Sequence, residues 1–160
     1  IALQNQLSGM TTASLPALSS AQMPTGSVLQ VVSSSTVPGH VSTTSTSFID
    51  SGIYADITPT STSSKIYVSF DIGMTFVDAS SLRLAIARGT STLQTSTYGH
   101  YIEPKTAATY QPAFISLIDS PSTTSATRYS LYFRTGNSSA QNYCSHTGST
   151  TSIVLMEIAG

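Results

Sequence analysis

The chain has 160 residues, of which 8% are charged and 39% are hydrophobic, and its formal net charge is −1. This length fits one domain with a sizeable core better than two. A disordered chain combines low hydrophobicity with high net charge, so the composition excludes disorder and predicts a folded domain. Ser and Thr stand where Lys and Glu usually do, which predicts a neutral, hydroxyl-rich surface that favours oligomerisation.

The small number of charges also excludes two kinds of partner. The six lysines and arginines are scattered along the chain, whereas a nucleic-acid-binding face needs many cations together. No apolar run approaches the roughly 20 residues that cross a bilayer. We therefore expect no nucleic-acid partner and no membrane insertion.

The first 26 residues differ from the rest of the chain. Their apolar residues follow no period, and Pro24 and Gly26 interrupt any regular element. We interpret residues 1–26 as an N-terminal arm that packs on a neighbouring subunit or a host shell, or as a linker from a longer fibre. The assembly residues of such an arm would be Leu3, Leu7, Leu15 and Leu18.

Beyond the arm, residues 27–160 form the predicted head domain. Helical periodicity is almost absent, while alternating or short apolar segments recur between turn-forming clusters. Eight or nine strands are predicted, at residues 27–32, 43–48, 54–57, 65–72, 82–88, 113–118, 127–134, 142–146 and 152–158. Their number and spacing predict an all-β, antiparallel β-sandwich or jelly roll.

Alternation within the strands predicts which side chains face the core. In residues 82–88 we expect Leu82, Leu84 and Ile86 to point inward and both arginines, Arg83 and Arg88, to point outward. Two further inward sets are expected, formed by Ile66, Val68, Phe70 and Ile72 and by Tyr129, Leu131 and Phe133.

No motif indicates catalysis, a metal site or a cofactor. The carboxylates are separated in sequence, so we expect them to be solvated or to cap turns, and His40, His100 and His146 lack metal-ligand spacing. Cys144 lies two residues from His146, but no third group is placed to orient the histidine. We therefore expect a buried or half-buried structural thiol at Cys144, no catalytic residues, no metal and no cofactor, and a protein that is not an enzyme.

The stretch from Thr97 to Lys105, followed by Tyr110, is the most ligand-like part of the chain. It combines aromatic rings, a histidine and charges of both signs, and Gly99 and Pro104 indicate a loop. The alternative is that these tyrosines pack at a subunit interface or on the shoulder of the sandwich. The candidate recognition residues are Tyr98, His100, Tyr101, Lys105 and Tyr110.

Five segments resemble a C-terminal tail-fibre-like domain found in virion proteins of marine and freshwater phages, including cyanophages. They are Pro24–Val32, Ser42–Gly52, Ile57–Ile66, Ile118–Tyr129 and Leu155–Gly160, in the expected order, while residues 71–111 depart from the pattern. The resemblance implies a homotrimeric β-sandwich head on the virion surface, in contact with other virion proteins of the capsid or tail.

The resemblance leaves several functions open, because fibre tips, neck appendages and capsid decoration proteins all carry such a domain. We expect a trimeric fibre-type head that mediates attachment, with a host-surface glycan as its ligand. The alternative is a decoration or cement protein that stabilises the capsid shell through its arm. A glycan-degrading tailspike is a more distant alternative, because neither motifs nor paired carboxylates support it.

Overall fold

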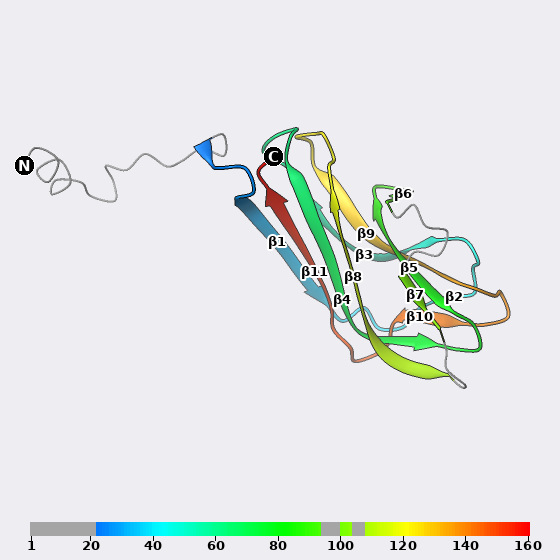
Figure 1. The fold of residues 1–160 in the computed structure, drawn as a ribbon. Helices are drawn as coiled ribbons and strands as arrows, with labels where there is room; N and C mark the ends of the chain where they lie inside the picture. The colour runs from blue at the N-terminus through cyan, green and yellow to red at the C-terminus, as the bar shows by residue number, and fades with distance from the viewer. Residues whose placement is uncertain (1–21, 94–99, 104–107) are drawn as a thin grey trace, which may run out of the picture.

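The computed structural model describes residues 22–93, 100–103 and 108–160, which form two antiparallel sheets packed face to face. Figure 1 shows the two layers. Sheet A contains β1 (Val28–Thr36), β2 (Val41–Thr43), β4 (Lys65–Val77), β8 (Thr109–Asp119), β10 (Asn142–Ser145) and β11 (Thr151–Ile158). Sheet B contains β3 (Ile49–Ile57), β5 (Leu82–Arg88), β6 (Ser91–Thr92), β7 (His100–Ile102) and β9 (Thr127–Thr135).

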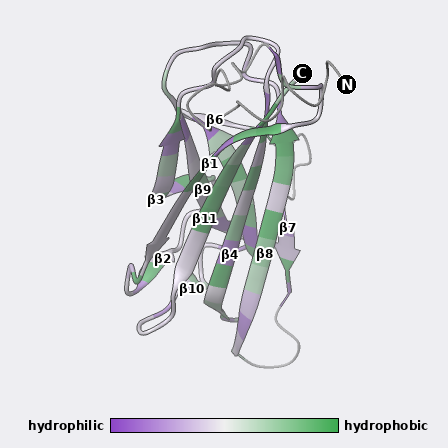
Figure 2. Ribbon diagram, turned by 90° about the vertical axis from the view of Figure 1, so that its left-hand side faces the viewer, coloured by the Kyte–Doolittle hydropathy of each residue, from purple (hydrophilic) through white to green (hydrophobic). Residues whose placement is uncertain are grey.

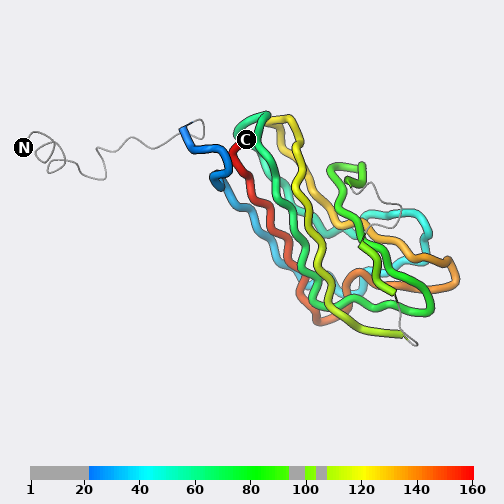
Figure 3. The backbone as a smooth tube through the Cα atoms, in the orientation of Figure 1, coloured from blue at the N-terminus to red at the C-terminus, as the bar shows by residue number. Residues whose placement is uncertain are grey.

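The order of the principal strands is that of a jelly roll. In sheet A, β11 lies between β1 and β4, and β8 pairs with the other edge of β4. In sheet B, β9 lies between β3 and β5, and β7 pairs with the far edge of β5. The first and last strands of the chain are thus neighbours in one sheet, as the backbone tube shows (Figure 3). The predicted all-β sandwich is confirmed.

The core between the sheets comes from the alternating residues of these strands. The three predicted inward sets, from β4, β5 and β9, are all buried. Cys144 is also fully buried in this core, as predicted. Alternation places these side chains on one face of each strand, and their burial supplies the main stabilisation of the two layers.

The prediction of a strand at residues 43–48 is wrong. The β2 strand ends at Thr43, and a turn follows in which hydroxyl groups satisfy the backbone. The amide of Ser45 donates to Thr43 Oγ1 at 2.9 Å, and the amide of Ser47 donates to Ser45 Oγ at 3.1 Å. Such local hydrogen bonds compete with the sheet ladder, so this Ser/Thr segment forms a turn.

The predicted recognition loop is also wrong in part, because His100–Ile102 forms strand β7. Ile102 pairs with Leu82 of β5 and is buried, so the core fixes this segment in sheet B. The short β6 strand was not predicted either, because a strand of two residues carries no periodic signal.

The outward orientation expected for Arg88 is wrong, whereas Arg83 does point outward. Arg88 has the same parity as Leu82, so its side chain turns inward at the end of β5. Its Nη1 lies 2.9 Å from Asp119 Oδ2 on β8, and the hydroxyl of Tyr129 donates to the same oxygen at 2.7 Å. Burial raises the pKa of Tyr129, and the hydrogen bond to Asp119 raises it further. This cluster links the two sheets.

Substituting the two arginines of β5 tests their orientation. Arg88→Ala should destabilise the fold by about 1–3 kcal/mol, because it removes the charged donor from the partly buried Asp119. Arg83→Ala, on the outer face of the same strand, should change stability by about 1 kcal/mol or less. Chemical denaturation measures both changes, and equal effects would contradict the assigned faces.

Candidate functional site

The described members of the predicted recognition site, His100, Tyr101 and Tyr110, lie on two different sheets. Tyr98 and Lys105 lie outside the described residues, as do the arm residues Leu3, Leu7, Leu15 and Leu18. His100 and Tyr101 are exposed on β7 at the edge of sheet B, whereas Tyr110 belongs to β8 of sheet A. Tyr110 therefore has other neighbours than those the sequence suggested.

Tyr110 is one of five aromatic side chains that gather at one end of sheet A. We call this group the aromatic cluster, and its members are His40, Phe76, Tyr110, Tyr143 and His146. The rings of Phe76 and Tyr110 have centroids 4.8 Å apart, and those of Tyr110 and His146 are 4.9 Å apart. These separations are within the range in which aromatic pairs attract each other.

Strand pairing explains why residues so distant in sequence meet here. Phe76 on β4 pairs in register with both Tyr110 on β8 and Tyr143 on β10. Val41 of β2 pairs with Ser145 of β10, which places His40 and His146 side by side beyond that pair. The sequence contains no local signal for this cluster, because its members come from four separate segments.

The aromatic cluster is accessible and has a polar rim. Tyr110 is 54% exposed and His40 is also exposed, whereas the other three members are half-buried. At the rim, the Gln141 side chain donates to Ser42 Oγ at 3.3 Å and accepts from the Tyr143 hydroxyl at 3.2 Å. Exposed rings beside an amide and hydroxyls are suited to a ligand with both apolar faces and hydroxyl groups.

A second feature is the apolar outer face of sheet A. Strand register aligns four side chains across it in one row, which we call the apolar row: Val31, Met156, Tyr67 and Ile118. Ile118 is 61% exposed, and Phe114, two outward-facing positions before it on β8, is 53% exposed. Figure 2 shows hydrophobic bands along β8 and its neighbours on this side. Large exposed apolar patches are typical of interaction surfaces, so this face is a candidate for one.

Only two charged residues belong to the outward-facing positions of β1, β4, β8 and β11. They are Lys65 near one end of β4 and Asp71 toward the other. Six residues of extended strand separate these charges by about 20 Å. The remaining outward positions of these strands are apolar or carry hydroxyl groups, so contact with another apolar face would desolvate little charge.

The outer face of sheet B has a different chemistry, in which arginines lie over aromatic rings. Arg128 Cζ lies 3.6 Å from the ring centroid of Tyr54, and Arg128 also makes two hydrogen bonds with Asp56, at 2.9 and 3.0 Å. The hydrogen bond from Arg128 lowers the pKa of Asp56. These groups satisfy one another, which favours a structural role at this edge of the sheet.

Glu157 is the residue whose environment the sequence reasoning missed. It was expected to be solvated or to cap a turn, yet it is fully buried on β11. Its carboxylate accepts hydrogen bonds from Gln30 Nε2 and Ser64 Oγ at 2.6 Å, and from the amide and hydroxyl of Thr60 at 2.6 and 2.7 Å. No local signal could have identified it, because its partners lie about 100 or more residues away.

These hydrogen bonds outweigh the effect of burial on the pKa of Glu157. Desolvation acts to raise the pKa of the carboxyl, but the four donors stabilise the charged form, and the net effect is a lowered pKa. With four donors, the carboxylate holds three segments together and is not placed to act as a catalytic base.

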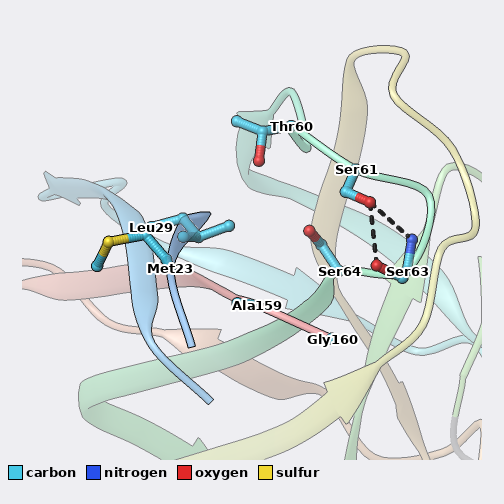
Figure 4. Close-up of a pocket in the computed structure, with 8 residues that line it drawn as sticks. All are labelled: Met23, Leu29, Thr60, Ser61, Ser63, Ser64, Ala159 and Gly160. Atoms are coloured by element: carbon cyan, nitrogen blue, oxygen red, sulfur yellow. Dashed lines mark hydrogen bonds between the residues drawn. The ribbon is translucent and has the colours of Figure 1, made fainter. Parts of the chain in front are cut away.

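Beside the hydrogen bonds of Glu157, a pocket of about 350 Å³ is lined by Met23, Leu29, Thr60, Ser61, Ser63, Ser64, Ala159 and Gly160 (Figure 4).

The structure gives no support for Cys144 as a nucleophile. Burial raises the pKa of its thiol, which disfavours the reactive thiolate. Among the described residues, no group of three or more His, Cys, Asp or Glu side chains could hold a metal ion. The same part of the chain contains no helix that is long and apolar enough to cross a membrane.

Comparisons with known proteins leave the geometry as the main guide to function. A scan of protein-family models finds no family that matches the chain, and a search of curated proteins finds no significant relative.

Acid should weaken the fold through Glu157. Because its folded pKa lies below the ordinary value of 4.5, its stabilisation is present above about pH 4.5 and is lost as the pH falls through the folded pKa. Glu157→Gln should cost about 1–3 kcal/mol at pH 7 and should reduce the dependence of stability on acid.

Thermal melts between pH 7 and pH 3 measure this difference. Asp50→Asn, which neutralises an exposed carboxylate on sheet B and keeps the oxygen that accepts from the Gly52 amide, is the matched control and should behave like the native chain. The assignment would fail if Glu157→Gln melted like Asp50→Asn at every pH.

Proposed function

We propose that this chain is an attachment domain on the surface of a phage particle, which binds a glycan through the aromatic cluster. The observation that carries the proposal is the meeting of five rings from four segments, with Tyr110 and His40 exposed. Aromatic faces stack on the apolar faces of sugar rings, and the Gln141 amide and neighbouring hydroxyls are able to bind sugar hydroxyls.

The character of the cluster narrows the glycan class. No member of the cluster is a carboxylate, ammonium or guanidinium group, so it provides no fixed charge for recognition of an acidic sugar. We propose a neutral polysaccharide of the host surface as the ligand. The phage context rests on the resemblance of the five segments to tail-fibre-like domains.

The working form that we propose is a homotrimer, as the resemblance implies, and the apolar outer face of sheet A supports self-association. The apolar row and Phe114 would be covered by a neighbouring copy, and this contact would desolvate little charge. Oligomerisation also multiplies weak glycan contacts, because several clusters on one particle bind together.

The glycan proposal is tested with a panel of immobilised neutral and acidic polysaccharides. Tyr110→Ala should reduce binding to the neutral ligand about tenfold, because one stacked aromatic contributes roughly 1–2 kcal/mol to a binding site. Tyr101→Ala is the matched control, since Tyr101 is an exposed tyrosine on the other sheet.

The outcomes of this experiment separate the alternatives. Loss of binding with Tyr101→Ala alone would return the site to the β7 region that the sequence suggested. Loss of trimers with Tyr110→Ala would place Tyr110 at a subunit interface. Unchanged binding with both variants would reject attachment through tyrosines.

Self-association is tested separately by light scattering at micromolar concentration. The native chain should be a trimer, and Ile118→Asp should yield monomers, because it places a charge in the apolar row. Thr124→Asp, which adds the same charge in the exposed loop after β8, should remain trimeric. A native monomer, or a trimer that tolerates Ile118→Asp, would contradict this interface.

A further inference from the structure

We propose that His40 and His146 together bind a divalent transition-metal ion of the zinc type. The centroids of their rings are 4.2 Å apart, and the ring planes meet at 72°. Imidazole nitrogen is a preferred ligand of Zn²⁺, Ni²⁺ and Cu²⁺. No local sequence pattern indicates this pair, because 106 positions separate the two histidines.

Strand pairing fixes the two histidines relative to each other. Val41 and Ser145 are register partners in β2 and β10, and the histidines are the next residues outward on each side. The His146 amide donates to the Met74 carbonyl at 3.1 Å, which ties its backbone to β4. Before His40, Gly39 has a φ of +77°, the left-handed conformation that turns the chain into β2 and that glycine adopts most easily.

The spacing of the rings is close to that of a chelate. Two imidazole nitrogens, each about 2.0–2.1 Å from one tetrahedral zinc ion, place their ring centroids about 5.2 Å apart. The observed separation is 4.2 Å, so side-chain rotations that move the two rings about 1 Å apart and turn one nitrogen of each toward the ion would form the chelate. Such rotations are available because His40 is exposed.

The nitrogens are also available for coordination. Within the described residues, neither imidazole takes part in a hydrogen bond through its side chain. Both rings also pack on aromatic neighbours: the centroids of His40 and Tyr143 are 5.2 Å apart, and those of His146 and Tyr110 are 4.9 Å apart. With two protein ligands, the remaining coordination positions would face solvent and be filled by water. A site of this kind binds more weakly than a structural site with four protein ligands.

A bound ion would connect the turn before β2 to the end of β10. That connection would hold the edge of the aromatic cluster in one arrangement, since His40 and His146 are two of its five members. The inference goes beyond glycan binding and does not depend on it, because metal binding is measured directly on the purified chain.

Isothermal titration with ZnCl₂, together with thermal melts in the presence of ZnCl₂, tests the site. The native chain should bind about one zinc ion, and its melting temperature should rise with zinc concentration. His40→Ala should weaken binding at least about tenfold, since even the loss of an outer-shell partner costs 10–100-fold. Binding should also weaken at acid pH, because the ligating imidazoles must be neutral.

Two control variants make the outcome specific. His100→Ala removes the exposed histidine on β7 and should leave zinc binding unchanged, and Tyr110→Ala should retain zinc even where it loses the glycan. Because His40 is exposed in a turn, His40→Ala should fold, and His40→Gln provides a second variant at the same position. Absence of zinc binding by the native chain, or binding that survives both His40 variants, would overturn the proposal.

Discussion

The position of β11 between β1 and β4 is the constraint on which the rest of the structure depends. This strand pairs with β1 on one side and with β4 on the other, and its inward side chains Ile153 and Leu155 are buried in the core. The same strand carries Glu157, whose carboxylate holds Gln30 of β1 and the turn that contains Thr60 and Ser64. The core packing of Ile153 and Leu155 and the hydrogen bonds of Glu157 therefore both require the same register of β11 against its neighbours.

This arrangement is dominated by contacts between distant parts of the chain. Closing such large loops costs entropy before the strands gain their pairing energy, so we expect slow folding for a domain of this size. The hydroxyl-rich turns offset part of this difficulty, because they satisfy their own backbone locally, as the Thr43–Ser47 turn does.

The two faces of the sandwich that point away from the core have different chemistry. Sheet B carries arginines that are already engaged with aromatic rings and, for Arg128, with a carboxylate. Sheet A exposes Phe114 and Ile118 without a covering element in the described structure, and ends in the aromatic cluster. This asymmetry favours sheet A as the face that contacts other molecules, both copies of the chain and ligand.

The alternation of apolar and polar residues predicted most of the fold, because this pattern is visible within each strand and needs no knowledge of distant contacts. It predicted the inward faces of β4 and β9 correctly and placed Cys144 in the core. It was wrong for Arg88, although the same alternation should have placed that side chain inward beside Leu82 and Leu84. The charge of Arg88 favours the surface, whereas its position in the alternation of β5 favours the core. The inward position is stable because Asp119 on the opposite sheet pairs with the guanidinium group.

The candidate sites depended on contacts that no local pattern records. The sequence by itself determined a Ser/Thr-rich, all-β domain with few charged residues. Only the tertiary structure decided that Tyr110 lies with His40 and His146 and apart from Tyr101, and that Glu157 is buried among four donors. The physical reason is that strand pairing brings together residues about 100 positions apart, and their chemistry arises from that proximity.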